Sequence, residues 1–334
     1  MTSTMQKAAG MLLAGALLLV VYGASAQNVR WRASGSFPAS HSTAIAMEVF
    51  KSEVARLSKN TIQVDLFPGN TLGGGFEQVD QLRTGQIQMA WGGLSFYDKL
   101  VPEFSAATLP FSATSSHQAI CQMETELGHY LEEKAAEKGI LLIGMGNIGA
   151  RHVTNNKRPI KTVDDLRGLK IRTPSGDAWT LTFRAVGANP TPIDIGELYQ
   201  ALQQGLVDGQ ENPYDNMLVR KFFQVQKYVS NTGHFNDWSG YMVNKAAFDQ
   251  LKPEQQKAVR DAMFTTVAVQ RAISERENKT ALAGLIKGGM QYDALTPAEL
   301  AKFREATRSV YTEVRKKAGD KAVDLAEAAI KQCQ

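Results

Sequence analysis

The sequence predicts an α/β fold arranged as two lobes. Strand and helix patterns alternate from residue 29 to residue 91, and the same alternation returns from residue 169 onward. Such alternation is typical of a mostly parallel sheet with helices packed on its faces. The chain has 334 residues, of which 308 follow a predicted leader of 26, and a chain of that length usually exceeds one hydrophobic core.

The first half of the chain contains the clearest periodic segments. Ile62, Val64 and Leu66 alternate with polar residues, which indicates a half-buried strand. Other apolar residues recur at helical spacing and predict amphipathic helices. The predicted strands are residues 29–34, 62–66, 87–91 and 140–143, and the predicted helices are residues 42–59, 76–84 and 116–138.

The second half repeats this style and ends in helix. Strands are predicted at residues 169–172 and 241–244, and helices at residues 177–186 and 196–204. From Pro253 onward the pattern is nearly all helical, with breaks at residues 288–289 and 296–297. No flexible linker separates the halves, so we expect the chain to cross between the lobes more than once.

The first 26 residues have the features of a cleavable signal peptide. Lys7 precedes an apolar run over residues 11–22, and Ala24, Ser25 and Ala26 fit a cleavage site of small residues. The run is shorter than the roughly 20 residues that a transmembrane helix needs. We therefore expect an exported protein, soluble once the leader is removed.

Charge and metal-ligand patterns exclude several classes of function. The formal charge of +4 comes from interspersed acidic and basic residues, which argues against nucleic acid as a partner. The five histidines show no metal-ligand spacing, so no metal or cofactor is expected. Cys121 and Cys333 can form a disulfide in an oxidising compartment, but their spacing does not decide whether they do.

Residues 144–149 match the pattern GxGxxG directly after a predicted strand. A dinucleotide fingerprint requires a helix to open on the last glycines, because the pyrophosphate binds at the helix N-terminus. Residues 150–156 instead indicate extended chain, and Pro159 follows closely. We interpret these glycines as part of a crossover between lobes. No GxSxG motif and no evident acid–base pair is present, so the sequence does not predict an enzyme.

Three polar residues are candidates for binding a carboxylate. Arg172 ends a predicted strand before Pro174, where ligands bind in open α/β sheets, and its guanidinium matches a carboxylate in two places. Asn212 lies in a polar stretch before Pro213 and can donate an amide hydrogen bond, or can serve only in a turn. Arg151 is either a second cation facing the same anion or an exposed strand residue.

Five motifs occur in order along the second half of the chain: RHVTN at 151–155, DDLRGLKIR at 164–172, GANPTP at 187–192, ELYQALQ at 197–203 and VDGQENP at 207–213. Together they resemble the extracytoplasmic solute receptors of TRAP transporters, the DctP family. The resemblance extends over essentially the whole chain after the leader. It implies a two-lobed periplasmic-binding-protein-like fold with a long lobe-bridging helix, a helical C-terminal tail and no catalytic activity.

The resemblance also implies a function and a domain division. A periplasmic receptor, expected as a monomer, would bind a small carboxylated metabolite and deliver it to TRAP membrane subunits for uptake driven by an ion gradient. Arg172 would pair with the ligand carboxylate, Asn212 would help to fix it, and Arg151 would face the same anion. We assign residues 27–149 plus 238–277 to one lobe and residues 150–237 plus 278–334 to the other. A subunit that presents its ligand to a membrane sensor remains the alternative, and a nucleotide-dependent enzyme is less favoured.

The identity of the acid depends on further candidates. Phe37, Trp91 and Trp179 offer flat apolar surfaces to a sugar ring or an aromatic acid, with ordinary core packing as the alternative. Ser175 and Gly93 complete the predicted ligand-binding set. Gly75 and Gly93 stand where family members that bind sialic acid carry acidic residues, which argues against that ligand. C4-dicarboxylates, uronic or aldonic acids, hydroxy or keto acids and aromatic acids remain open.

Overall fold

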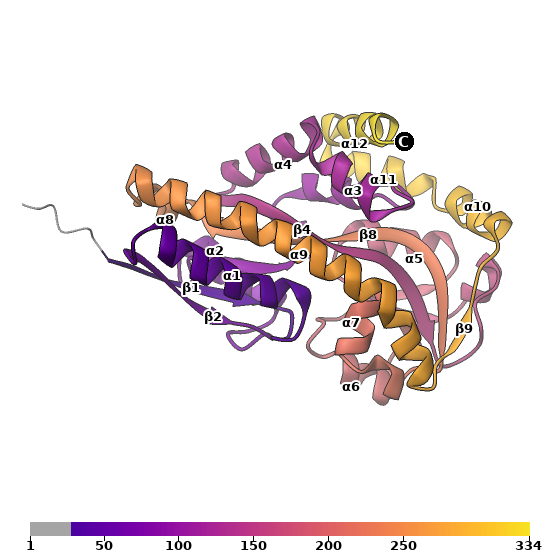
Figure 1. Ribbon diagram of the computed structural model, residues 1–334. Coiled ribbons are helices and arrows are strands. Elements are labelled where there is room, and N and C mark those ends of the chain that lie inside the picture. Colours follow the sequence, from indigo (N-terminus) through magenta and orange to yellow (C-terminus); the bar gives the residue numbers. More distant parts are fainter. Residues whose placement is uncertain (1–27) are drawn as a thin grey trace, which may run out of the picture.

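The computed structural model describes residues 28–334, so the predicted signal peptide lies outside the described residues. These residues form a nine-stranded sheet in the order β2-β1-β3-β8-β4-β7-β5-β6, with β9 paired to β8. Figure 1 shows the sheet running through two lobes, with helix α9 lying diagonally across both. We call the β2-β1-β3 end the first lobe and the β7-β5-β6 end the second lobe.

The first lobe follows the predicted alternation closely. In β1, Trp31 and Ala33 are buried while Arg30 and Arg32 are exposed, as a strand with one covered face requires. β1 pairs in parallel with both β2 and β3. The elements of this part of the first lobe are β1 (Val29–Gly35), α1 (Ser42–Leu57), β2 (Ile62–Phe67), α2 (Gly75–Thr84), β3 (Met89–Gly93) and the 3-10 helices η1 (Leu94–Tyr97) and η2 (Pro102–Thr108).

The prediction of one helix over residues 116–138 is wrong. The segment forms α3 (Ser116–Met123) and α4 (Glu126–Glu137). Thr125 begins the second helix, because its side chain accepts a hydrogen bond from the backbone N–H of Leu127. Gly128 lies so close to the Met123 carbonyl that a Cβ there would be only 2.0 Å from the oxygen. The tight turn between the helices therefore depends on glycine.

Two long strands join the lobes. The predicted strands at 140–143 and 241–244 are only the first-lobe ends of β4 (Ile140–Asn155) and β8 (Tyr228–Asn244). β8 is antiparallel to both β3 and β4, so the expectation of a parallel sheet holds inside each lobe but fails at the centre. The β4–β8 register shifts between Leu142 and Gly144, between Asn147 and Gly149, and between Arg151 and Val153. These irregularities lie where the chain passes from one lobe to the other.

The GxGxxG segment lies within β4, which confirms that the chain beyond it is extended rather than helical. Its glycines face α9 (Pro253–Lys287): a Cβ on Gly144 would lie 2.8 Å from Met263, and one on Gly146 would lie 2.5 Å from Gln270. The glycines therefore allow the long helix to pack closely on the strand. Gln270 in turn donates to the Asn147 carbonyl at the bulge (3.0 Å).

The second lobe contains two strands that the sequence pattern did not predict, β6 and β7. β6 is a terminal strand of the sheet, where Pro190 and Pro192 are tolerated because one side of the strand needs no partner. The elements are η3 (Val163–Leu166), β5 (Lys170–Thr173), α5 (Asp177–Ala185), β6 (Asn189–Pro192), α6 (Leu198–Gln203), β7 (Gly209–Asn212), α7 (Tyr214–Val219) and η4 (Phe222–Gln224).

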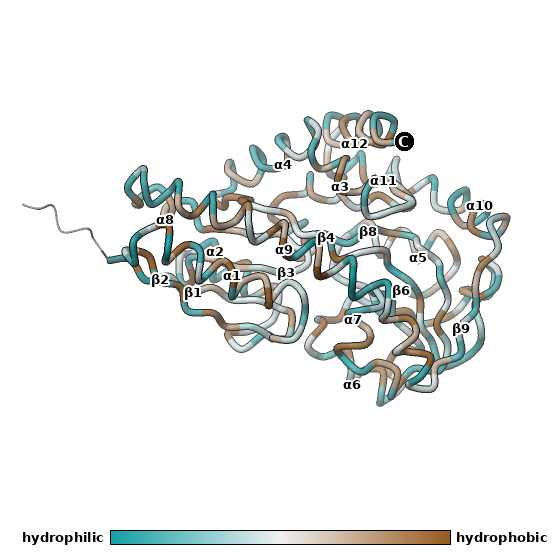
Figure 2. Tube along the Cα trace, viewed as in Figure 1, coloured by the Kyte–Doolittle hydropathy of each residue, from teal (hydrophilic) through white to brown (hydrophobic). Residues whose placement is uncertain are grey.

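From Pro253 onward the chain is helical apart from the short strand β9, close to the nearly all-helical prediction. Helix α9 spans both lobes, and Figure 2 shows hydrophilic and hydrophobic stretches alternating along it. The remaining elements are α8 (Lys245–Asp249), β9 (Gln291–Asp293), α10 (Pro297–Ala306), α11 (Ser309–Ala318) and α12 (Asp320–Gln332). None of the helices within residues 28–334 is long and apolar enough to span a membrane.

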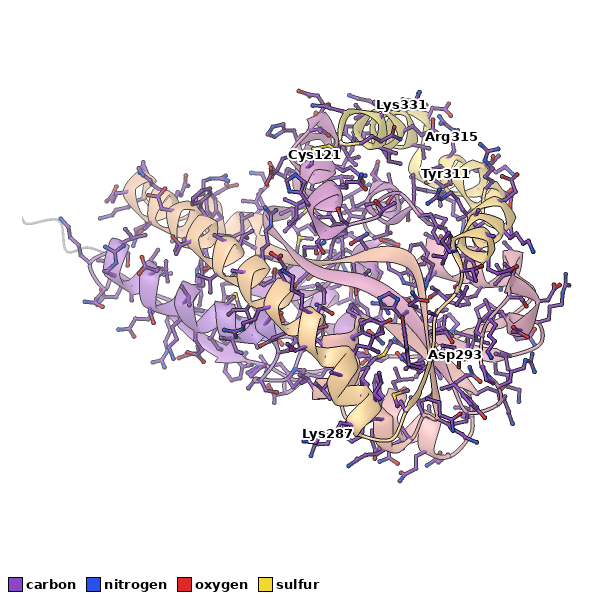
Figure 3. The ribbon with its side chains drawn as sticks, turned by 45° about the vertical axis from the view of Figure 1, so that its right-hand side comes forward. Cys121, Lys287, Asp293, Tyr311, Arg315 and Lys331 are labelled. Atoms are coloured by element: carbon purple, nitrogen blue, oxygen red, sulfur yellow. A yellow bond between two sulfur atoms is a disulfide. The ribbon has the colours of Figure 1, made fainter. Side chains whose placement is uncertain are left out.

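A disulfide between Cys121 and Cys333 closes the C-terminal region onto α3, with Cα atoms 5.9 Å apart. Figure 3 shows Cys121 beside the C-terminal helices. Helices α11 and α12 pack on η2, and α12 also contacts α3 and α4, which the sequence-based division assigned to the first lobe. The exact lobe boundaries therefore stay a prediction.

Candidate ligand-binding site

A small cavity of about 30 Å³ lies where the two lobes meet. The elements that border it are the end of β5, the end of β7, the turn after β1 and the η1 segment. Its lining residues are Ser36, Phe37, Gly93, Ser95, Phe96, Arg151, Arg172, Pro174, Ile195, Asn212, Asn216 and Asp237. The predicted residues among them are Phe37, Gly93, Arg151, Arg172 and Asn212. The lobes are closed tightly around this cavity, so a sugar-sized molecule would enter only if they separated.

Arg172 is a buried cation without an acidic partner. It lies near the end of β5, where Pro174 stops the strand, and only 1% of its surface is exposed. Its Nε donates to the Ile193 carbonyl at 2.8 Å, and no carboxylate within residues 28–334 forms an ion pair with it. Burial lowers the Arg172 pKa to about 9, and repulsion from Arg151 adds to this effect. The side chain stays protonated at neutral pH and presents its outer N–H groups to the cavity.

Arg151 is buried to the same degree but is fully paired. Its Nε and one outer nitrogen donate to the Glu211 carboxylate at 2.5 and 2.7 Å, and the other outer nitrogen donates to Asp237. Burial lowers the pKa of Arg151, but the two carboxylates outweigh burial and raise it. The Glu211 carbonyl accepts a further Arg151 N–H, so one N–H of this guanidinium remains for a ligand.

His234 completes this buried cluster. Its Nε2 lies 3.0 Å from a Glu211 carboxylate oxygen, and its Nδ1 lies 2.8 Å from the Thr232 hydroxyl. Burial raises the pKa of Glu211, but the charge of Arg151 and the His234 contact reverse this and lower it overall. The cluster joins β4, β7 and β8 next to the cavity, so it fixes the strands that surround Arg172 and Asn212.

Asn212 lies at the end of β7 within a chain of amide hydrogen bonds. Its Nδ2 donates to the Gln210 side chain, and its Oδ1 accepts from Asn216 Nδ2 at 2.7 Å. Arg220 donates in turn to Asn216 Oδ1 at 2.9 Å. This chain fixes the orientation of the Asn212 amide and leaves its second N–H available to the cavity.

The other predicted residues take different positions. Phe37 lines the cavity and stacks on His41 with ring centroids 4.2 Å apart. Trp91 is part of the first-lobe core, and Trp179 packs beneath Arg151, whose guanidinium carbon lies 5.9 Å from its ring. Ser175 donates to the Ser95 carbonyl at 3.4 Å. Trp91, Trp179 and Ser175 therefore do not line the cavity; for the two tryptophans the core-packing alternative describes the geometry.

Several lining residues were not among the predictions. Ser95, Phe96 and Ile195 follow strands in apolar or turn-like segments that carry no polar motif. Asp237 lies within β8, whose central part the sequence did not reveal as a strand. Ser36 lies in the bend directly after β1. Proximity to the predicted strand at 87–91 was the one signal that could have found Ser95.

Three hydrogen bonds cross from one lobe to the other at the cavity rim. Asp194, after β6, accepts from the backbone N–H of Gly75 at 2.9 Å and from the Asn70 side chain at 3.0 Å. Arg220 donates to the Ser36 carbonyl at 2.9 Å. A Cβ on Gly74 would lie 3.1 Å from Asp194 Oδ2, so the glycine-rich loop permits this approach. These contacts stabilise the closed arrangement.

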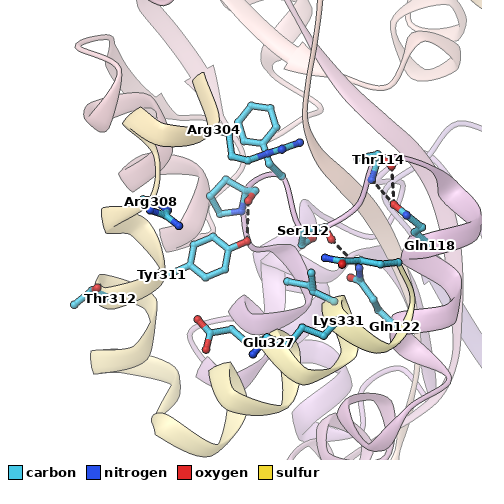
Figure 4. Close-up of a pocket in the computed structure, with 14 residues that line it drawn as sticks. Ser112, Thr114, Gln118, Gln122, Arg304, Arg308, Tyr311, Thr312, Glu327 and Lys331 are labelled. Atoms are coloured by element: carbon cyan, nitrogen blue, oxygen red, sulfur yellow. Dashed lines mark hydrogen bonds between the residues drawn. The ribbon is translucent and has the colours of Figure 1, made fainter. Parts of the chain in front are cut away.

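A larger groove of about 840 Å³ lies elsewhere, between the 110–114 segment and helices α3, α10, α11 and α12 (Figure 4). Its side chains are mostly exposed or half-buried, and the Tyr311 hydroxyl already donates to the Pro110 carbonyl at 3.0 Å. Arg308 and Glu327 already have ion-pair partners in Glu305 and Arg315. The smaller cavity, with a buried and unpaired guanidinium, is the better candidate for specific binding.

The fold and this interlobe cavity are those of a two-lobed solute-binding protein. The family model described as "Bacterial extracellular solute-binding protein, family 7", the DctP model, matches residues 33–317. The chain belongs to this family, the periplasmic solute-binding proteins of TRAP transporters. The prediction of a receptor rather than an enzyme is confirmed, because its relatives are solute-binding receptors.

Three relatives illustrate the range of the family. The C4-dicarboxylate-binding periplasmic protein DctP of Rhodobacter capsulatus is 29% identical, covering 84% of each chain. The sugar acid binding protein of Advenella mimigardefordensis strain DPN7T, solved with galactonate, is 26% identical and superposes with a TM-score of 0.89 over 92% of this chain and 99% of that one. A TRAP periplasmic protein of Sulfitobacter sp. NAS-14.1, solved with β-D-galacturonate, is 28% identical, with a TM-score of 0.86 over 90% and 99%.

Proposed function

We propose that this protein is exported to the periplasm, closes its lobes around a small organic-acid anion held by Arg172, and presents the loaded receptor to TRAP membrane subunits. The observation that carries the proposal is the buried guanidinium of Arg172, which has no acidic partner in residues 28–334. An uncompensated buried charge is costly, and a bidentate carboxylate is the natural counter-charge for arginine. Relatives with galactonate, galacturonate and C4-dicarboxylates support an organic acid as the ligand.

The contacts around Arg172 define the role of each neighbour in this proposal. Asn212 supplies an oriented amide N–H beside the ligand carboxylate. Arg151 acts mainly through its pairing with Glu211 and Asp237, which holds the strands that form the site, and contributes at most one N–H to the ligand. The protein is expected to act as a monomer and to bind its ligand without turnover.

Ligand binding is tested by thermal-shift screening of an organic-acid library against residues 27–334. A ligand at 100 times its Kd should stabilise the fold by about 2.7 kcal/mol, which corresponds to a rise of about 5 °C in Tm. The proposal fails if no carboxylate raises the Tm, or if Arg172→Ala keeps full affinity for one that does.

Export and delivery need separate measurements. Mass spectrometry of the protein from the periplasmic fraction should show a mature chain that starts at Gln27. Cells that lack the gene should lose uptake of the identified acid and regain it with the wild-type gene, but not with Arg172→Ala. Uptake that persists without the gene would argue against delivery to the membrane subunits and in favour of a sensing role.

A further inference from the structure

Three charged side chains line the cavity, and two of them, Arg151 and Asp237, form an ion pair. Arg151 is matched by the carboxylate of Asp237 and, from below, by that of Glu211. Arg172 is the remaining one, and its outer N–H groups have no partner among the described residues. Arg172 is therefore the one cation of this lining that forms no ion pair, although Glu211 and Asp194 lie near enough to raise its pKa.

We propose that this receptor selects organic acids with a single carboxylate and discriminates against dicarboxylates. This inference rests on the proposed function and names the class of ligand for the same site. The family alone does not decide the matter, because its members include proteins that bind sugar monoacids and proteins that bind C4-dicarboxylates.

Uncharged side chains make up the lining outside the Arg151, Arg172 and Asp237 positions. Phe37, Phe96, Pro174 and Ile195 contribute apolar surface, and Phe37 and Ile195 are almost fully buried. A second ligand carboxylate beside these groups would lose its hydration without gaining a cation. It would also share a small space with the Asp237 carboxylate, which repels it.

Ser36 indicates what the far end of the ligand can be. Its hydroxyl is buried, lines the cavity and has no hydrogen-bond partner in the described residues. A hydroxyl can donate to a neutral carbonyl or hydroxyl oxygen and can also accept from a hydroxyl. The site therefore fits a monocarboxylate with neutral oxygen functions, such as a hydroxy acid, a keto acid or a sugar acid.

Arg220 is a half-buried guanidinium near the cavity that could serve a second carboxylate, but its contacts direct it elsewhere. It does not line the cavity, and its Nε and one outer nitrogen donate to Asn216 Oδ1 and to the Ser36 carbonyl, both at 2.9 Å. Its guanidinium carbon lies 6.0 Å from the centre of the Phe37 ring. Arg220 thus holds Ser36 and the wall in place rather than presenting a charge to the ligand.

Matched acids that differ only at the far end test the inference by isothermal titration calorimetry at pH 7.5. The pairs are 2-oxopentanoate against 2-oxoglutarate and 2-hydroxybutanoate against malate, followed by the same design for whichever acid stabilises the protein most in the screen. The monocarboxylate should bind at least about tenfold more tightly, because the dicarboxylate buries an unpaired charge. A dicarboxylate that binds equally or more tightly overturns the inference.

Variants at Arg172 and Ile195 separate the inference from the proposed function. If dicarboxylates win but Arg172→Ala abolishes their binding, the receptor function stands and the selectivity does not. If no acid of either class binds, the proposed function itself fails. Ile195→Arg adds a cation to the uncharged wall and should raise the dicarboxylate-to-monocarboxylate affinity ratio at least tenfold over Ile195→Gln. An unchanged ratio would show that charge is not what excludes dicarboxylates.

Discussion

Arg172 and Arg151 allow the same substitution to be made at two buried guanidiniums in one cavity. Both are almost fully buried, but Arg151 forms ion pairs with Glu211 and Asp237 whereas Arg172 pairs with no carboxylate of the described chain. Methionine has a similar apolar stem and removes the charge. We therefore expect Arg172→Met and Arg151→Met to have different effects on stability and on affinity.

The magnitudes follow from the contacts. Arg172→Met removes two charge-assisted hydrogen bonds to the ligand, each contributing about 1.5–3 kcal/mol, so affinity should fall by about 10²- to 10⁴-fold. It removes one hydrogen bond to the protein, at Ile193, so the free energy of unfolding without ligand should change by about 1 kcal/mol or less. Arg151→Met removes the cation that pairs with the buried carboxylates of Glu211 and Asp237, which should lower the free energy of unfolding by about 3–5 kcal/mol.

Urea denaturation without ligand measures the stability of each variant, and calorimetric titration with the identified acid measures affinity. Equal destabilisation by the two substitutions would refute the idea that Arg172 is held without a protein counter-charge. Retained ligand affinity in Arg172→Met would refute its role as the anchor. Circular dichroism before titration confirms that each variant is folded under the conditions of the binding measurement.

Three further predictions concern parts of the fold that support the cavity. The double variant Cys121→Ser and Cys333→Ser opens a loop with a sequence separation of 212, so the free energy of unfolding should fall by up to about 5 kcal/mol while ligand affinity stays the same; a matching effect of reductant on the wild type alone checks this. Asp194→Ala removes hydrogen bonds between the lobes and should weaken ligand binding about tenfold, whereas Asp164→Ala, in an exposed ion pair, should not; equal affinities would contradict the role of these contacts in closure. Burial raises the pKa of Asp215 from 3.8 to about 8, so its contribution to stability is present below pH 4 and is lost as the pH rises through 8. Asp215→Asn should reduce the dependence of the free energy of unfolding on pH in this range, and an unchanged dependence would be evidence against this role of Asp215.

Helices and strands with one buried face were predicted well, because their apolar residues recur at regular spacing in the sequence. The strands at Val29 and Ile62 and the helices that follow them show regular alternation, and the structure reproduces them within a few residues. The greater part of the long strands β4 and β8 was not predicted, because these strands contain glycines and buried polar residues and are covered on both sides. Their pattern reflects contacts with α9 and with the cavity, which are far apart in sequence.

The candidate site likewise has residues that could be predicted from the sequence and contacts that could not. The resemblance to a family identified Arg172 and Asn212, and the structure brings them to one cavity with Arg151. The pairing of Arg151 with Glu211 and Asp237 could not be predicted, because it depends on the register of three strands. Trp91 and Trp179 have flat rings that could contact a sugar, but both rings pack in the hydrophobic core.

Opposing interactions at the lobe interface give a physical reason why closure should follow ligand binding. The bonds from Asp194 and Arg220 to the first lobe favour the closed form, whereas closure without an anion removes water from the Arg172 charge. A bound carboxylate supplies the missing counter-charge only where the site is closed, so its affinity for the closed form exceeds that for the open form. Because a ligand shifts such an equilibrium only through differential affinity, we expect the unpaired guanidinium to be the group through which ligand binding drives closure.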